Sequence, residues 1–262
     1  MTRTGLAVAL AVAVVAGLVL GVYPQLDLAV ARLFMGEGGF PLAANATLRI
    51  LREGSSAIIA LLAAPAAVAV GFKLVRPQRR MLVRGRAALF LLSTLVLGPA
   101  LVTNAVLKEH YGRARPIHVT ELGGHDTFTP WWDPRGACPA NCSFVAGEAS
   151  GAFWTLAPAA LAPPAWRPLA YGAAIAFGTM VGLLRMAFGG HFLSDVIFAG
   201  VLTFVIVWLA HGAIYRWRRT RLSDEAIERA LERLALALRR PFRPQNPPRL
   251  MGEPADLPDR GG

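Results

Sequence analysis

Six apolar segments, separated by polar and basic stretches, follow one another along the chain. They cover residues 5–22, 55–72, 87–107, 143–161, 169–184 and 191–215. Segments of this length and apolarity are typical of helices that cross a bilayer. The pattern predicts an all-α fold, a polytopic membrane helix bundle with six transmembrane helices. The first segment could also be a cleaved signal peptide, but it is long for one and no small-x-small cleavage site follows it, so we expect a retained helix.

Basic residues mark which ends of these segments face the cytoplasm. Residues 73–86 hold six Lys or Arg side chains and no acid, and residues 216–221 form a second basic block. Because short cytoplasmic loops are enriched in Lys and Arg, both stretches are expected on the cytoplasmic side. With six crossings, both termini are then cytoplasmic, and the protein is expected in a bacterial inner membrane.

The composition agrees with a membrane protein and argues against an ordinary soluble domain. Of the 262 residues, 55% are hydrophobic, and the mean hydropathy is +0.46. The net charge of +11 would suit a nucleic-acid-binding protein. Basic loops that contact anionic lipid account for the charge equally well, so we expect a membrane partner and no nucleic acid.

The chain divides into one membrane domain and a cytoplasmic tail. Residues 1–215 form the membrane domain, within which residues 23–53 read as an amphipathic segment on the membrane surface. Residues 216–240 contain a basic amphipathic helix, capped by Ser223 and suited to anionic inner-leaflet lipid. The Pro-rich residues 241–262 are expected to be disordered.

A histidine and an aspartate lie four residues apart at the start of the last apolar segment, just after an arginine. These are Arg185, His191 and Asp195. On a helix, residues four apart share one face, so a carboxylate can hold one imidazole nitrogen and leave the other free as a nucleophile. The alternative is a loop arginine followed by a helix-capping His-Asp pair.

A second polar cluster follows the third apolar segment, and it contains Lys108, Arg113 and Arg115. Arginine offers a fork of N–H donors for phosphate oxygens, and lysine a point charge. In a six-helix topology this cluster and the His-Asp pair lie on the same, periplasmic side. Together they predict a pocket for a phosphate group beside a nucleophile.

Two motifs with this order and spacing resemble those of the type 2 phosphatidic acid phosphatase superfamily, which shares its site with vanadium haloperoxidases. The matching residues are Lys108, Arg115 and Pro116, then Arg185, His191 and Asp195. The resemblance covers roughly residues 50–215. It implies hydrolysis of a membrane-lipid phosphomonoester at the periplasmic face through a phosphohistidine, without a metal or another cofactor.

The middle motif of that superfamily usually reads Pro-Ser-Gly-His, and this chain departs from it. Only Gly147 matches, because Ala146 stands where Ser is usual and Glu148 where His is usual. We expect a helix to begin here, capped by Asn141 or Ser143, with free backbone N–H groups facing the site. The residues from 138 to 148 resemble the lipid A 1-phosphatase branch.

The resemblance assigns a role to each candidate residue. His191 is the expected nucleophile, Asp195 its orienting carboxylate and Glu148 the proton donor, with His110, His118 and His125 as alternative donors. The expected phosphate ligands are Lys108, Arg115, Arg185, Gly147 and Ala146.

Lipid A 1-phosphate is the first expected substrate. The alternatives are phosphatidylglycerophosphate, undecaprenyl pyrophosphate or phosphatidic acid as substrate, a lipid phosphotransferase, and a catalytically impaired lipid-binding relative.

The two cysteines, Cys138 and Cys142, lie in one polar loop with three residues between them. In an oxidising periplasm they could form a local disulfide, and otherwise they are free thiols. Two cysteines alone are too few for a zinc site. We expect the disulfide.

Overall fold

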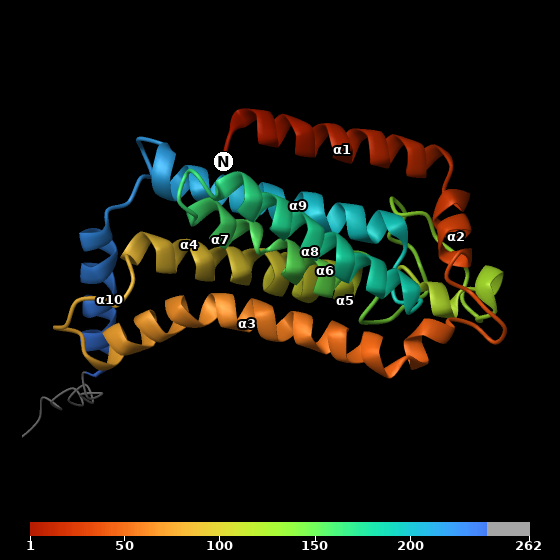
Figure 1. Cartoon of the computed structure of the whole chain (residues 1–262), viewed down its shortest axis with the longest axis horizontal. Helices are drawn as coiled ribbons and strands as arrows, with labels where there is room; N and C mark the ends of the chain where they lie inside the picture. Colours follow the sequence, from red (N-terminus) through yellow and green to blue (C-terminus); the bar gives the residue numbers. More distant parts are fainter. Residues whose placement is uncertain (240–262) are drawn as a thin grey trace, which may run out of the picture.

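The structure, a computed structural model, describes residues 1–239 and is an all-α bundle in which five helices are long and apolar enough to cross a membrane. Figure 1 shows these helices side by side along the long axis of the molecule. The five are α1 (Arg3–Val22), α3 (Ala46–Val75), a helix made of α4 (Gly85–Leu95), the π-helical η2 (Val96–Leu107) and α5 (Lys108–His110), then α8 (Arg167–Ala187), and α9 (Leu193–His211) with the π-helical η5 (Gly212–Arg216). A long connection after α5 contains the short turns η3 (Pro116–His118) and η4 (Thr120–Leu122).

The fourth predicted segment forms two short helices, α6 (Gly147–Phe153) and α7 (Leu156–Leu161), in place of one long helix. Almost every residue of the pair is buried within the bundle. Between them, the Nε1 atom of Trp154 donates a hydrogen bond to Thr94 Oγ1 at 2.9 Å. Neither helix is long enough to count as a span, so the described residues contain five candidate spans, and the sixth crossing stays a prediction.

Residues 23–53 do not form one surface segment, because the chain turns inward in two places. Helix α2 (Gln25–Arg32) lies at one end of the bundle and buries Asp27, and the 3-10 turn η1 (Pro41–Ala44) follows. The side chain of Asn45 then accepts a hydrogen bond from Leu48 N at 3.0 Å and caps α3 at its start. The first turns of α3 therefore include Arg52, which sequence reasoning had assigned to the surface.

Buried hydroxyl groups connect the central helices. Ser150 on α6 shares hydrogen bonds with Thr103 on η2, at 3.0 Å, and with Thr203 on α9, at 2.8 Å. In an apolar bundle such interhelical hydrogen bonds help to fix how the helices pack. They hold α6 with its first turn toward the end of the bundle where α8 ends and α9 begins (Figure 1).

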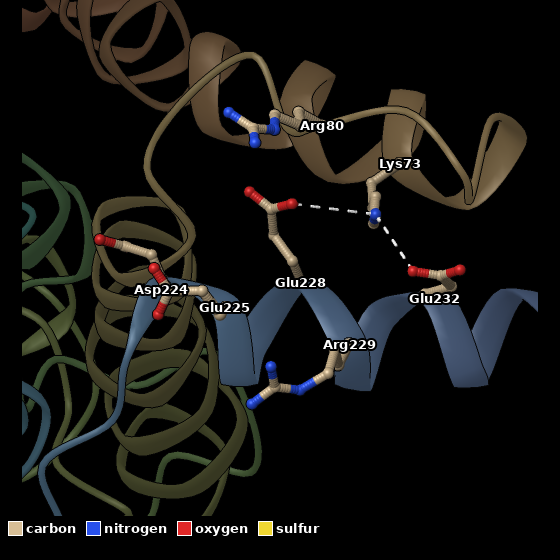
Figure 2. A pocket seen from close by; sticks show the side chains of 7 residues that line it. All are labelled: Lys73, Arg80, Asp224, Glu225, Glu228, Arg229 and Glu232. Atoms are coloured by element: carbon tan, nitrogen blue, oxygen red, sulfur yellow. Dashed lines mark ion pairs between the residues drawn. The ribbon is translucent and has the colours of Figure 1, made fainter.

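Helix α10 (Asp224–Leu238) lies across the opposite end of the bundle, and Ser223 caps it as predicted. Figure 2 shows acidic residues of α10 around the buried Lys73 of α3, whose Nζ lies 3.9 Å from Glu228 and 3.6 Å from Glu232. One face of the amphipathic helix therefore packs on protein. The tail expected to be disordered, residues 241–262, lies outside the described residues.

Candidate active site

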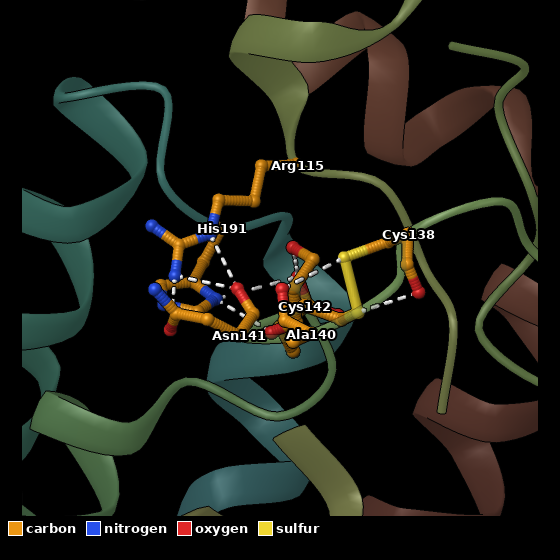
Figure 3. Close-up of a disulfide and its surroundings, with 8 residues drawn as sticks. Arg115, Cys138, Ala140, Asn141, Cys142 and His191 are labelled. Atoms are coloured by element: carbon orange, nitrogen blue, oxygen red, sulfur yellow. Dashed lines mark hydrogen bonds and ion pairs between the residues drawn. A yellow bond between two sulfur atoms is a disulfide. The ribbon is translucent and has the colours of Figure 1, made fainter. Parts of the chain in front are cut away.

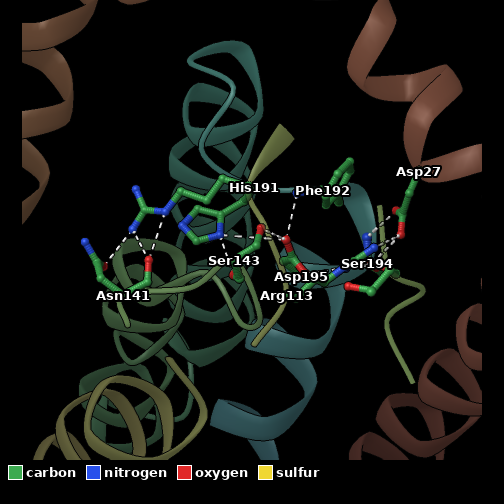
Figure 4. A network of polar contacts seen from close by, with 10 residues as sticks. Asp27, Arg113, Asn141, Ser143, His191, Phe192, Ser194 and Asp195 are labelled. Atoms are coloured by element: carbon green, nitrogen blue, oxygen red, sulfur yellow. Dashed lines mark hydrogen bonds and ion pairs between the residues drawn. The ribbon is translucent and has the colours of Figure 1, made fainter. Parts of the chain in front are cut away.

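The predicted site residues come together at one end of the bundle. Lys108 lies in α5, Arg185 in the last turn of α8, His191 in the turn between α8 and α9, Asp195 in the first turn of α9 and Glu148 in the first turn of α6. Segments more than 80 residues apart in sequence thus supply one polar cluster, part of which is shown in Figure 4.

His191 is buried, and a backbone carbonyl holds its ring. Nδ1 lies 2.6 Å from the carbonyl oxygen of Ser143. A carbonyl only accepts hydrogen bonds, so Nδ1 carries the proton of the neutral ring and the lone pair is on Nε2. Burial lowers the pKa of His191, as do the nearby cations Arg185 and Arg115, while Asp195 acts in the opposite direction. The ring is therefore neutral and able to act as a nucleophile at neutral pH.

Asp195 does not bond directly to the imidazole, contrary to the expectation from the four-residue spacing. Its Oδ2 atom lies 3.8 Å from His191 Nδ1 and accepts hydrogen bonds from Ser143 Oγ at 2.5 Å and from Phe192 N at 2.8 Å. The physical reason is that Asp195 is an acceptor in the first turn of α9, where free backbone N–H groups need partners. The carboxylate supplies a nearby negative charge, and the backbone sets the tautomer.

A buried network behind Asp195 contains Arg113, which the sequence had placed in the phosphate pocket, and Asp27, to which it gave no role (Figure 4). Arg113 Nη1 lies 2.5 Å from Asp195 Oδ1, and Arg113 Nη2 lies 2.8 Å from Asp27 Oδ2. All three side chains are completely buried. Arg113 was recognised only as one cation of a cluster, and nothing in the sequence indicated that Asp27 would reach the site.

Glu148 is held by two arginines. Arg52 donates from Nε to Oε2 at 2.8 Å and from Nη2 to Oε1 at 2.7 Å, and Arg185 Nη1 lies 3.7 Å from Oε1. A carboxylate between two guanidinium groups is stabilised in its ionised form. It can donate a proton only after one of these pairs opens, which is a condition that the sequence did not reveal.

Arg115 is positioned by the loop that the two cysteines close. Cys138 and Cys142 form a disulfide. Between them, Asn141 accepts hydrogen bonds from Arg115 Nη2 at its carbonyl oxygen, at 2.7 Å, and at Oδ1, at 2.6 Å, as Figure 3 shows. Asn141 does not cap a helix as expected, because α6 begins only at Gly147. Its role is to fix Arg115 near His191.

The glycine and alanine of the middle motif differ in what they offer a phosphate. Gly147 opens α6, where a Cβ atom would lie 2.5 Å from Asn104 Oδ1, so a larger residue would require the Asn104 side chain to move. Ala146 packs its methyl group in an apolar cluster and donates its N–H to the carbonyl oxygen of Asp195 at 3.3 Å. The structure therefore gives Ala146 no free donor, and its expected contact with phosphate lacks support.

One unsatisfied donor lies in the site. The buried Nε of Arg185 has no hydrogen-bond partner among the described residues. Gly190 allows this guanidinium to approach, because a Cβ there would lie 2.6 Å from Arg185 Nη2. Lys108 lies within electrostatic range of Arg115 and Arg185. We refer to Lys108, Arg115 and Arg185 as the cationic cluster, and its charge suits an anion. Within residues 1–239, no group of three or more His, Cys, Asp or Glu side chains could hold a metal ion.

Comparison with known proteins finds relatives for about half of the chain. The family described as the PAP2 superfamily matches residues 87–220. A lipid A 4'-phosphatase of Francisella tularensis subsp. novicida (strain U112) is 40% identical over 132 residues, which are 50% of this chain and 60% of that protein. A lipid A 4'-phosphatase of Rhizobium leguminosarum is 37% identical over 134 residues, 51% of this chain and 57% of the relative.

A third relative, the lipid A 4'-phosphatase of Rhizobium etli, is 34% identical over 134 residues, which are 51% of this chain and 52% of that protein. The chain thus spans little more than half the length of the curated relatives it matches. No solved structure matches it significantly. The expected likeness to lipid A 1-phosphatases is not supported, since these relatives are 4'-phosphatases.

Proposed function

Because the chain belongs to the PAP2 superfamily, a family of metal-independent lipid phosphomonoesterases, we propose that it removes a phosphate from lipid A, with the 4'-phosphate as the first candidate. One observation carries the proposal. The Nδ1 of His191 is held by Ser143, which leaves Nε2 as a nucleophile close to Arg115 and Arg185. The similarity to lipid A 4'-phosphatases supports the choice of lipid A and of the 4' position.

In the proposed reaction, Nε2 of His191 attacks phosphorus, and the bond from phosphorus to the sugar oxygen breaks. The phosphoryl group then resides on His191 until water hydrolyses it and restores the imidazole. The cationic cluster neutralises the phosphate oxygens, and Asp195 stabilises the positive charge that develops on the ring. Charge stabilisation by fixed side chains takes the place that a metal ion has in other phosphatases.

The sugar oxygen that leaves needs a proton, because a 4'-alkoxide is a poor leaving group. Glu148 remains our candidate for this role. An incoming phosphate competes with Glu148 for Arg185, and a carboxylate that loses a cationic partner binds a proton more readily. Opening of this ion pair would thus couple phosphate binding to the arrival of the proton donor.

An apolar groove beside the site supports a lipid substrate. It has a volume of about 520 Å³ and runs between α8 and the start of α3. Leu184 and Ala187 line it on either side of Arg185 in sequence, and Leu48 lines it one turn before Arg52. A lipid chain in this groove would place its phosphorylated end beside the cationic cluster.

The proposed orientation follows from the charge pattern. The site faces the periplasm of a bacterial inner membrane, and α6 with α7 provides the sixth crossing. The N-terminus and α10 are cytoplasmic, in agreement with their common position at the end opposite the site (Figure 1). Exposed arginines of α10, Arg229 and Arg233, are available for anionic lipid.

The test is phosphate release by the purified protein in detergent with a chelator present. The panel is lipid A, phosphatidylglycerophosphate, undecaprenyl pyrophosphate and phosphatidic acid, and mass spectrometry identifies the position lost from lipid A. We expect 4' loss by the wild type and by Glu109→Gln, an exposed control, and none by His191→Gln. Loss of the 1-phosphate would reassign the position, and release from no lipid would refute the phosphatase.

A further inference from the structure

Asp27 accepts three hydrogen bonds from site residues, and no catalytic role yet explains this buried acid. It lies in α2, 60 residues before the part of the chain that the PAP2 superfamily matches, and its side chain is completely buried. A buried carboxylate is costly unless hydrogen bonds and a cation compensate for the lost water. Asp27 has both, and every partner belongs to the site.

The partners of Asp27 flank the proposed catalytic residues. Ser194, next to Asp195 in sequence, donates its N–H to Asp27 Oδ1 at 2.9 Å and its hydroxyl to Oδ2 at 2.6 Å. Arg113 donates from Nη2 to the same Oδ2 at 2.8 Å. Figure 4 shows Asp27 on one side of Arg113 and Asp195 on the other. Asp27 thus fixes the start of α9 and the arginine that bonds Asp195.

Arg113 is shared between two carboxylates. It lies 2.5 Å from Asp195 and 2.8 Å from Asp27, and the rings of Phe192 and Phe128 enclose it. One guanidinium and two carboxylates leave one net negative charge among side chains that are completely buried. If Asp27 were neutral, Arg113 and Asp195 would form a neutral pair, and the net negative charge of this group near His191 would be lost.

We propose that Asp27 is a positioning residue that acts through Arg113, holding Asp195 in place and preserving its negative charge toward His191. The proposal rests on the proposed function, in which His191 becomes positively charged as it accepts the phosphoryl group. Asp27 never touches substrate in this scheme. It would make the N-terminal part of the chain a necessary support for the chemistry.

The charged groups around His191 set the expected direction of its pKa. Asp195 on α9 favours the protonated ring, Arg185 on α8 and Arg115 after α5 disfavour it, and Glu148 on α6 contributes a further negative charge. Replacing Asp27 by a neutral residue removes negative charge from this set. The pKa of His191 should then fall, and its phosphorylated, cationic form should be less stable.

The test compares Asp27→Asn with Glu37→Gln, which neutralises an exposed acid in the same region. With a soluble phosphomonoester as substrate, we expect turnover of Asp27→Asn to fall about tenfold, the size expected for one charge acting over several ångströms in a partly polar interior. The acid limb of its pH–rate profile should move to lower pH, while competitive inhibition by inorganic phosphate stays unchanged. Glu37→Gln should match the wild type in all three.

A second measurement does not need activity. Nuclear magnetic resonance of histidine-labelled protein, with the His191 signal assigned by its absence in His191→Gln, should show a lower His191 pKa in Asp27→Asn. If the wild type hydrolyses nothing, the proposed function fails, but this titration still tests whether the charge of Asp27 affects His191. An active wild type with an unmoved acid limb and an unmoved titration in Asp27→Asn would refute the inference alone. If Asp27→Asn does not fold, Asp27→Glu, which keeps the charge, must restore the wild-type limb.

Discussion

The Nδ1 atom of His191 lies 2.6 Å from the main-chain carbonyl oxygen of Ser143 but 3.8 Å from the carboxylate of Asp195. The tautomer of His191 and the electrostatic environment of its ring are therefore controlled by different groups. The carbonyl fixes which nitrogen carries the proton, and no side-chain substitution removes it. The carboxylate acts on the ring through its charge, and this separation allows the two effects to be measured one at a time.

Asp195→Asn tests the charge. Because Ser143 still holds the tautomer, we expect kcat to fall about 10- to 100-fold, or about 1.4–2.8 kcal/mol of lost transition-state stabilisation, with little change in KM. Kinetics on a soluble phosphomonoester measure this, with the exposed Glu109→Gln as control. Loss as complete as in His191→Gln would mean that the carboxylate does more than supply charge.

The pH profile tests the buried state of His191. Burial lowers its pKa below the ordinary value of 6.5, and the nucleophile must be neutral to attack. As pH falls through the lowered pKa, protonation of Nε2 removes the nucleophile. The acid limb of kcat/KM is therefore expected below pH 6.5, and a limb above that value would contradict the assignment.

Arg52→Ala tests the double ion pair of Glu148. Without Arg52, Glu148 has only Arg185 as a cationic partner and competes with the substrate phosphate for it. We expect KM to rise about tenfold, equivalent to about 1.4 kcal/mol. Arg49→Ala, an exposed change on the same helix, should have no effect. An unchanged KM in Arg52→Ala would show that the pair is only structural.

Removal of the disulfide tests whether it helps to position Arg115. The loop from Cys138 to Cys142 is too short for its closure to contribute much to global stability, but it presents Asn141 to Arg115. The Cys138→Ser, Cys142→Ser double variant should therefore show a several-fold higher KM, the size of one weakened charged hydrogen bond, and a nearly unchanged melting temperature. The opposite pattern would assign the disulfide to stability alone.

A bulky substitution tests the apolar groove. Leu183→Trp places a large ring in the groove, whereas Ile175→Trp adds the same ring to an exposed position of α8 that does not line it. We expect Leu183→Trp to raise KM for the lipid about tenfold and to leave a soluble phosphomonoester unaffected. Equal effects on the lipid and on the soluble phosphomonoester would mean that the groove does not bind the lipid chain.

The sequence predicted the features that local patterns encode. Five of six apolar segments became long helices, and the two motifs meet at one end of the bundle as their order implied. The remaining segment divides around Trp154, four residues before Pro158, which has no N–H to donate to the Trp154 carbonyl oxygen. Hydropathy alone does not indicate such a break. Long-range pairing explains why Arg52 was missed, since its partner Glu148 is 96 residues further along the chain.

The contacts of Asp27 and Arg52 also limit how freely this protein can be recombined. Both residues lie before residue 87, whereas their partners Arg113 and Glu148 lie within the portion that the PAP2 superfamily matches. A chimera that took only residues 87–220 from a relative would have that relative's nucleophile but would keep Asp27 and Arg52 of this chain as its charged partners. The two halves of the membrane domain are therefore expected to change together during evolution, as one inherited unit.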